Sequence, residues 1–569
     1  MNQRWVVLLV LAAALLFFAK VGMPLTDGDS AYYGTIARRI VETGDWITLH
    51  SRSNDFVDKP PLSIWMIAAA YRVFGVSDWT TRLVHSLVAV GTVLLTYALA
   101  RRFYRPRTAF LGAAVLCTSL LLAYMGQVPQ QDVPLTFLSI LALYGFVRYL
   151  QTGRPGAGLL CCLASALGVL NRGLQGVVFP AAVAGAYLSI RAARRRSFWL
   201  PPAPGEEGER VPVGRRADLW LTLLGGAVLF TAVAVPWFYL GYLRQGPDFL
   251  NYFFGSGNAR YLHPIRAGGA WDSVIYLPML VLGFLPWSGF IFPALCRAWR
   301  EGRSAASGAG DQGEAPAEGA LFMIVWFLVG FLLPFGIRWR VIRYLLPAFP
   351  PLAVLIGRTL DRSLAETKQD SGAGRGVWVG AWLTLAAALL FLVSVFIAAR
   401  PFPQAQAGFQ PVILPFLVLF TLTLGAGAAA ALSLHRPAWM IGVLAVGSLV
   451  SYLTLFDQLD HSAYLLNPWK AAARTVNANA RPGDRVVCYG DLPVSSFLRL
   501  DIAQRVEPAD EAQLGRWLAE FSRPGSGRRF FVLSTGEALD RYRRAHPEAP
   551  ELAVTRYPGG RVVAVAGAH

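Results

Sequence analysis

Residues 24–66 read PLTDGDSAYYGTIARRIVETGDWITLHSRSNDFVDKPPLSIWM, and this stretch is the first long polar interruption in a chain dominated by apolar runs. Within residues 31–41, Tyr33, Ile36 and Ile40 recur at the spacing of one helical face. Such a helix is amphipathic, and we expect it to lie on a membrane surface with its arginines turned to water. Polar and aromatic groups would then gather at one face of the membrane.

The composition is that of a polytopic membrane protein. Of 569 residues, 55% are hydrophobic and 15% are charged, and the mean hydropathy is +0.44. The net charge of +18 comes from Lys and Arg that cluster between apolar runs, which is typical of cytoplasmic loops and gives no reason to expect a nucleic-acid partner. The five cysteines have neither the spacing of a metal site nor that of a disulfide framework.

Thirteen apolar segments are candidate transmembrane helices, several of them shorter than the roughly 20 residues of a perpendicular span. They lie near 5–24, 81–100, 108–124, 132–150, 157–171, 173–190, 218–240, 273–296, 320–336, 344–360, 376–398, 411–433 and 438–456. The loops rich in arginine all fall on one side of this arrangement, which the positive-inside rule assigns to the cytoplasm. We therefore predict a membrane domain over residues 1–456, with a long first outer loop over residues 25–80.

After residue 456 the sequence becomes polar. Short apolar runs at 484–489, 529–533 and 562–565 predict strands between helical stretches. Residues 457–569 are thus expected to form a small α/β domain on the extracytoplasmic side, within the usual size range of a domain. It has no Gly-rich phosphate loop, so no chemistry is assigned to it.

The first outer loop offers two charged candidates. Asp29 follows the first apolar segment, where a carboxylate can act as a general base or bind a metal; the alternative is a helix N-cap. Lys59 precedes two prolines that keep the segment extended, and its compact charge suits a phosphate; the alternative is a lysine that reaches for the membrane interface.

Other outer loops carry further polar candidates. Residues 248–264 place aromatic side chains beside Asn258 and Arg260, and an arginine offers a forked donor for phosphate. Arg340 and Arg343 lie on the outer side against the positive-inside trend, which suggests anion binding. An aromatic belt at the interface would explain the aromatics of 248–264 but not Arg260.

Two charged residues lie at the ends of apolar spans. Asp132 begins the span at 132–150, and Arg172 separates two apolar segments. Both are costly in a membrane unless they are paired or face water, so each has a functional or a structural role.

These motifs resemble those of the aminoarabinose transferase and protein O-mannosyltransferase superfamily of GT-C glycosyltransferases. The matching elements are listed here: Asp29 with Tyr33, Ile36 and Arg38, then Gly44-Asp45-Trp46, Asp58-Lys59-Pro60, Asn251-Tyr-Phe-Phe followed by Arg260, Leu285-Pro-Trp287, and Arg340 with Tyr344. The resemblance covers most of the membrane part. It also implies about thirteen transmembrane helices and a terminal external domain.

The resemblance implies roles for individual residues. It makes Asp29 the catalytic or metal-associated acid, assigns the lipid phosphate to Lys59 and Arg260, and gives orienting roles to Tyr33 and Tyr344. Asp58 and Asp132 line the cavity, and Asp58 is a second candidate metal ligand. The chain departs from the aminoarabinose transferases at Asn258, where they have a histidine, and at Asn171-Arg172-Gly173, where they have Thr-Lys-Gly. Arg340 joins the expected phosphate ligands, and Arg343 and Arg172 the expected cavity lining.

We therefore expect an enzyme of the bacterial inner membrane. It would move a sugar from a polyprenyl-phosphate donor to an acceptor on the outer face, such as lipid A, another glycolipid or a protein. No cofactor is assigned, and a divalent metal stays an open alternative. A transporter or lipid flippase is the competing hypothesis, and a binding scaffold that acts through the C-terminal domain is a third.

Overall fold

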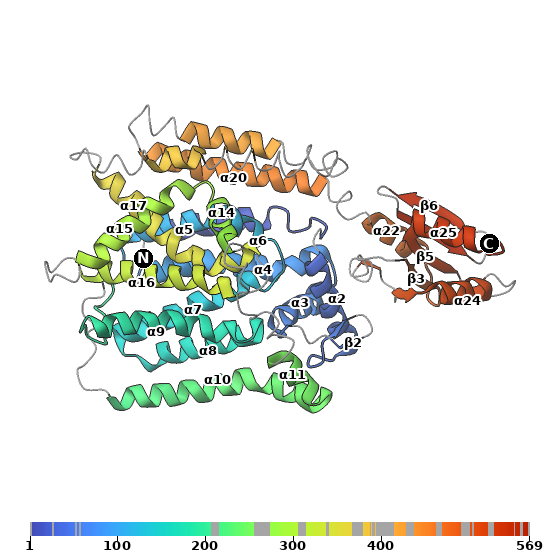
Figure 1. The fold of residues 1–569 in the computed structure, drawn as a ribbon, viewed down its shortest axis with the longest axis horizontal. Helices are drawn as coiled ribbons and strands as arrows, with labels where there is room; N and C mark the ends of the chain where they lie inside the picture. Colours follow the sequence, from blue (N-terminus) through green and yellow to red (C-terminus); the bar gives the residue numbers. More distant parts are fainter. Residues whose placement is uncertain are drawn as a thin grey trace.

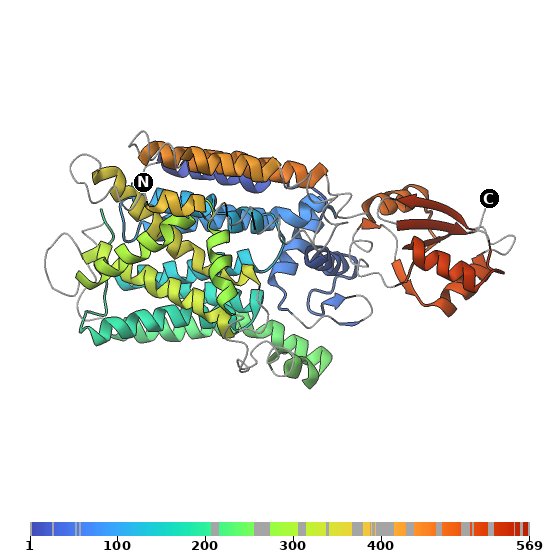
Figure 2. The ribbon, with the colours of Figure 1, turned by 45° about the horizontal axis from the view of Figure 1, so that its top comes forward.

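The computed structural model describes residues 3–25, 28–51, 54–55, 59–205, 216–254, 273–304, 314–336, 341–366, 379–386, 389, 393, 415–427, 437–461, 469–490, 501–502, 506–521, 529–550, 552–557 and 561–566. Long helices run side by side in a bundle, and a smaller unit that contains a β-sheet lies beyond one end of it (Figures 1 and 2). The described helices of the bundle are α1 (Gln3–Phe18), α2 (Gly28–Thr43), α3 (Leu62–Phe74), α4 (Asp78–Ala100), α5 (Pro106–Cys117), α6 (Leu120–Met125), α7 (Asp132–Thr152), α8 (Pro155–Arg172), α9 (Gln175–Ala193), α10 (Arg216–Gln245), α11 (Pro247–Phe254), α14 (Tyr276–Gly283), α15 (Ile291–Ser304), α16 (Glu314–Leu332), α17 (Phe349–Glu366) and α20 (Pro437–His461), with 3₁₀ turns η1 (Ser273–Ile275), η2 (Ser288–Phe290), η4 (Leu333–Gly336) and η5 (Ile342–Ala348).

Several of these helices are long and apolar enough to cross a bilayer. Among the described residues there are 7, or up to 8 if a bent pair counts as one span. The polytopic helical fold is therefore confirmed. The number thirteen stays a prediction, since residues 376–398 and 411–433 lie partly outside the described part.

The segment 273–296 is not the single straight span that its hydropathy predicts. It forms two helical pieces that meet at 116°. Pro286 lies at the break and has no N–H to continue a helical ladder. The Tyr452 hydroxyl on α20 lies 3.0 Å from the carbonyl oxygens of both Thr118 and Leu285 and shares its one proton between them. The Leu285 carbonyl also accepts from the Leu120 N–H, so backbone groups near the break have partners. The expected span 108–124 is also interrupted, at Thr118, between α5 and α6.

The segment predicted as the first outer loop is folded. It contains α2, the short antiparallel pair β1 (His50–Ser51) and β2 (Asn54–Asp55), and α3. The helix is amphipathic as predicted, because Tyr33, Ile36 and Ile40 are buried while Arg39 is exposed. Arg38 differs from the prediction: its side chain is only 16% exposed, because it binds Glu42 and the Ile502 carbonyl. The buried face of α2 packs with α3 and with the C-terminal parts of α8 and α10 in one apolar cluster.

The C-terminal part forms a five-stranded sheet with helices on both faces. In chain order it comprises α22 (Trp469–Asn479), β3 (Arg485–Tyr489), β4 (Val506–Ala509), α24 (Glu511–Phe521), β5 (Phe530–Thr535), α25 (Gly536–Ala545), β6 (Ala553–Tyr557) and β7 (Arg561–Ala566). The strand order is β4-β3-β5-β7-β6, with β3 parallel to β4 and β5, and β7 antiparallel to β5 and β6. The period-2 alternation of strands sends Val486 toward α22 and Val487 toward α24 and α25. The three predicted strands are present; β4 and β6 lie at the two edges and were not predicted.

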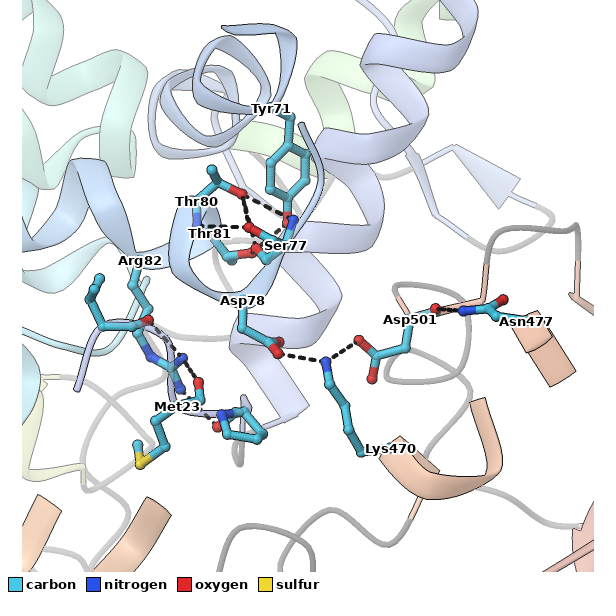
Figure 3. Close-up of polar contacts among 12 residues, drawn as sticks. Met23, Tyr71, Ser77, Asp78, Thr80, Thr81, Arg82, Lys470, Asn477 and Asp501 are labelled. Carbon is cyan, nitrogen blue, oxygen red and sulfur yellow. Dashed lines mark hydrogen bonds and ion pairs between the residues drawn. The ribbon is translucent and has the colours of Figure 1, made fainter. Parts of the chain in front are cut away.

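An ion triad joins this sheet unit to the bundle (Figure 3). Lys470 Nζ lies 2.5 Å from Asp78 Oδ2 and 2.6 Å from Asp501 Oδ1. Arg38 of α2 also donates to the carbonyl oxygen of Ile502 at 2.6 Å. The sheet unit is therefore attached to the segments that begin α4 and form α2.

The last described bundle helix runs past the predicted boundary at residue 456. Helix α20 continues to His461 because its acids have a partner: Lys20 Nζ lies 2.9 Å from Asp457 Oδ1 and 3.0 Å from Asp460 Oδ2. Pairing of these charges at the bundle end allows a polar extension of an apolar helix.

Candidate functional site

A polar cavity of about 150 Å³ lies where α2, α7, α8 and η5 meet. It is lined by Asp29, Tyr32, Tyr33, Lys59, Gln130, Gln131, Asp132, Arg172, Arg343 and Tyr344. Seven of these were singled out in the sequence, from stretches up to about 300 residues apart: Asp29, Tyr33, Lys59, Asp132, Arg172, Arg343 and Tyr344. The fold thus brings most of the candidate residues to one place.

Two arginines bind the two carboxylates of the cavity. Arg172 Nη1 forms an ion pair with Asp132 Oδ1. Arg343 Nε lies 3.6 Å from Asp132 Oδ2, and its Nη2 lies 3.3 Å from Asp29 Oδ2. The Asp132 side chain is only 5% exposed, so its charge depends on both arginines. Asp132 and Arg172, which a membrane protein tolerates only when they are paired, are therefore partners of each other.

The backbone explains how Asp132 and Arg172 meet. Asp132 is the first residue of α7 and Arg172 the last of α8, and the short connection between these helices makes them antiparallel neighbours. Gly173 has a φ of +64°, which favours glycine and lets the chain turn at once into α9. A Cβ on Gly176 would lie 1.9 Å from the carbonyl carbon of Gly168, so α8 and α9 can touch only with glycine there.

Two tyrosines complete the wall. The guanidinium of Arg172 lies over the ring of Tyr344, 4.8 Å from its centroid, in a cation–π contact. Burial, and then the charge of Asp29, raise the pKa of Tyr33. Its phenol therefore keeps its proton at neutral pH and is a hydrogen-bond donor.

The charge of the lining suits an anion. Three cations, Lys59, Arg172 and Arg343, face two carboxylates, Asp29 and Asp132. Lys59 is held in a non-helical segment because Pro60 and Pro61 follow it and α3 begins only at Leu62. Asp29 has a side chain that is 56% exposed, so this carboxylate is hydrated as well as paired.

An apolar extension adjoins the polar cavity. A second, smaller cavity shares Asp132, Arg172, Arg343 and Tyr344 with the first and is otherwise lined by Leu135, Gln175, Phe179, Gly330, Leu333, Pro334 and Pro347. The combined site has a charged chamber and an apolar arm that runs between α7, α9 and α16. The charged chamber can hold an anionic group, and the arm, of about 30 Å³, offers apolar contact beside it.

Some predicted site residues cannot be placed. Asp58, Asn258, Arg260 and Arg340 lie outside the described residues. Among the described residues, no group of three or more His, Cys, Asp and Glu side chains could hold a metal. The described neighbours of Asp29 supply an arginine rather than further metal ligands.

Sequence reasoning missed the uncharged members of the lining. Tyr32, Gln130 and Gln131 are next to Tyr33 and Asp132 in the chain, and their proximity to candidate charges was the available signal. An amide carries no cost in a membrane comparable to that of a charge, so the pattern that revealed Asp132 did not reveal them.

Comparison with known proteins agrees with the geometry. A family model described as dolichyl-phosphate-mannose-protein mannosyltransferase matches residues 58–202. An undecaprenyl phosphate-α-4-amino-4-deoxy-L-arabinose arabinosyl transferase of Pseudomonas aeruginosa is 30% identical over 470 residues, which are 80% of this chain and 76% of the relative. The transferase of the same name from Pseudomonas paraeruginosa is 28% identical over 584 residues, which are 96% of this chain and 96% of the relative.

Solved structures share the fold. The crystal structure of ArnT from Cupriavidus metallidurans in the apo state has a TM-score of 0.70 and 21% identity, covering 100% of this chain and 99% of that one. The same protein bound to undecaprenyl phosphate has a TM-score of 0.71 and 20% identity, covering 100% of both chains.

Proposed function

Because the chain belongs to the family of the undecaprenyl phosphate-aminoarabinose arabinosyl transferases, we propose that the cavity at Asp29, Lys59 and Arg343 is its active site. The protein is a membrane glycosyltransferase that uses a sugar linked to a polyprenyl phosphate. The observation that carries the assignment of the site is the excess of cations over carboxylates in a cavity that continues into an apolar arm.

The donor fits this site with its phosphate in the charged chamber and its first isoprene units in the apolar arm. Lys59 contributes a compact charge, and Arg343 a forked donor. Arg260 and Arg340 are further proposed phosphate ligands, and Asn258 and Asp58 are proposed members of the lining. The apolar arm offers contact to a lipid chain, which a lipid-linked sugar has and a free nucleotide sugar lacks.

The proposed chemistry is the transfer of the sugar from phosphate oxygen to an acceptor oxygen. As the bond between the anomeric carbon and the phosphate oxygen breaks, the bonding electrons stay on the phosphate, and Lys59 with Arg260 stabilises the growing negative charge. Asp29 accepts the proton of an acceptor hydroxyl, or positions the acceptor if that group is itself a phosphate. The contact between Arg343 and Asp29 holds the carboxylate at the mouth of the chamber.

The finer assignments are also proposals. Catalysis takes place on the outer face of the bacterial inner membrane, with the C-terminal sheet unit on that side. The acceptor is lipid A, another glycolipid or a protein. The sugar to test first is 4-amino-4-deoxy-L-arabinose, which the names of the relatives specify.

The test uses purified protein in detergent, where no gradient exists. Wild-type protein should transfer aminoarabinose from undecaprenyl phosphate to lipid A, and Asp29→Asn should lose at least about 100-fold in rate while its melting temperature is kept. A lipid flippase would give no covalent product under these conditions. Wild-type turnover by Asp29→Asn would refute the role of Asp29.

A further inference from the structure

Three segments that carry site residues are connected by a buried hydrogen-bond chain beneath the cavity. Ser63 Oγ donates to Asn171 Oδ1 at 2.6 Å, and Asn171 Nδ2 donates to the carbonyl oxygen of Gln131 at 2.9 Å. Gln131 Nε2 in turn lies 3.5 Å from the carbonyl oxygen of Pro60. Ser63 and Asn171 are fully buried, and Gln131 is 2% exposed.

Each segment of this chain is adjacent to a charged residue of the cavity. Pro60 follows Lys59, Gln131 precedes Asp132, and Asn171 precedes Arg172. These charged residues come from the non-helical segment before α3, the start of α7 and the end of α8. Asn171 contacts the other two segments with the two ends of one amide.

We propose that Asn171 is a positioning residue that sets the separation of Lys59, Asp132 and Arg172 for the phosphate of the lipid donor. This inference rests on the proposed function, since it assumes that the phosphate binds in the cavity. A planar amide is well suited to the role, because it offers one acceptor and one donor at a fixed distance. A side chain of similar size without polar atoms would leave the Ser63 hydroxyl and the Gln131 carbonyl without these partners in a buried place.

The effect on binding should be large compared with the size of the change. Loss of one charge-assisted hydrogen bond costs about tenfold or more in affinity, so a displacement of Lys59 that breaks its contact with the phosphate is sufficient. Loss of both Asn171 bonds would free the ends of α3 and α8 to shift relative to α7. The ion pair of Arg172 with Asp132 would persist, and Lys59 would move away from it.

A matched control exists at the other end of α7. Gln151 is also a buried amide with two hydrogen bonds: its Oε1 accepts from Arg102 Nε at 2.7 Å, and its Nε2 donates to the Arg102 carbonyl at 2.9 Å. It lies roughly 30 Å from Asp132, given 1.5 Å per helical residue. Gln151→Leu therefore removes a comparable buried amide without a link to the cavity.

The experiment measures the Kd of undecaprenyl phosphate and the melting temperature of the purified full-length protein. Asn171→Leu should raise the Kd about tenfold or more, and Ser63→Ala, which removes one of the two bonds, about threefold. Gln151→Leu should lower the melting temperature and leave the Kd within twofold. The milder Ser63→Ala keeps the test decisive if Asn171→Leu does not fold.

Two outcomes would count against the inference, and they are distinguishable from failure of the proposed function. Unchanged Kd in Asn171→Leu and Ser63→Ala, or an equal loss in Gln151→Leu, would make Asn171 merely structural, provided that Lys59→Ala weakens binding. Unchanged Kd in Lys59→Ala as well would overturn the location of the donor site itself.

Discussion

Arg343 Nη2 lies 3.3 Å from Asp29 Oδ2, while Nε of the same guanidinium lies 3.6 Å from Asp132 Oδ2. One side chain of η5 therefore joins the first residues of α2 to the first residue of α7. These three segments form the rim of the cavity. The position of Asp29 in the cavity thus depends on a residue more than 300 positions later in the chain.

Arg343→Ala should leave Asp132 with Arg172 as its described partner and release Asp29 from its arginine. We expect the rate of sugar transfer to fall about tenfold or more, because Asp29 loses the contact that holds it in place and misplacement of a reacting group lowers the rate steeply. Arg343→Lys should recover only part of the rate, because an ammonium cannot contact both carboxylates as a planar fork does. Equal rates for wild type and Arg343→Ala in the transfer assay would contradict the bridging role.

Lys59→Ala should weaken the binding of undecaprenyl phosphate about tenfold or more, because a charge-assisted hydrogen bond in a poorly hydrated cavity is lost. The matched control is Lys20→Ala, which removes another lysine of the helical bundle, bound to Asp457 and Asp460 instead of the cavity. Titration of the lipid into each purified variant measures the Kd. Similar affinities for the two variants would argue that general charge, not Lys59, attracts the phosphate.

The junction in Figure 3 should respond to pH. Burial, helped by the charge of Asp78, raises the pKa of Asp501 to about 6 against the opposing charges of Lys470 and Arg38. The docked structure therefore binds this proton more tightly than an exposed aspartate, whose pKa is about 4. The stability of the junction should be greatest at low pH and should fall as the pH rises from about 4 to about 6. The total fall is at most about 3 kcal/mol, and the stability is constant above that range.

Asp501→Asn tests this dependence, since it cannot ionise. Wild type loses stability between pH 4 and pH 6 as Asp501 ionises, and the variant does not. The melting temperature of the variant minus that of wild type should therefore rise over this range and stay constant above it. His546→Gln is the control. Glu511 and Glu548 raise the pKa of His546, so this exposed imidazole titrates at a higher pH than Asp501. Parallel curves for wild type and Asp501→Asn would contradict the pKa assignment.

Tyr452→Phe should destabilise the bundle without changing the site. The hydroxyl of Tyr452 shares one proton between two backbone carbonyls at helix breaks, and loss of this hydrogen bond should cost about 1 kcal/mol. Tyr97→Phe is the control, because the buried Tyr97 hydroxyl has no hydrogen-bond partner in the described part of the chain. We expect thermal unfolding to show a lower midpoint for Tyr452→Phe and no loss for Tyr97→Phe. A stable Tyr452→Phe would mean that the broken helices need no such partner.

The charged residues of the site were predictable from the sequence, because a charge at a membrane boundary is conspicuous. Asp29, Lys59, Asp132, Arg172 and Arg343 were all identified from their places in the apolar pattern. Their pairing was not predictable, since hydropathy gives the ends of helices but not which ends are neighbours.

Uncharged and broken elements were harder to predict. Asn171 and Gln131 act through hydrogen bonds whose partners lie far along the chain, and an amide leaves little mark on a hydropathy profile. The bend at Pro286 occurs within a continuous apolar run, so length and composition indicated one span. Tertiary partners such as Tyr452 make the break tolerable, and a local pattern does not contain them.

The central claim is that the donor phosphate binds in the cavity formed by Asp29, Lys59, Arg172 and Arg343. The most direct measurement is an electron cryomicroscopy structure of the purified protein with undecaprenyl phosphate. The account predicts phosphate density within hydrogen-bonding distance of Lys59 and the first isoprene units beside Leu135 and Phe179. Phosphate density at another site, with this cavity unchanged, would contradict it.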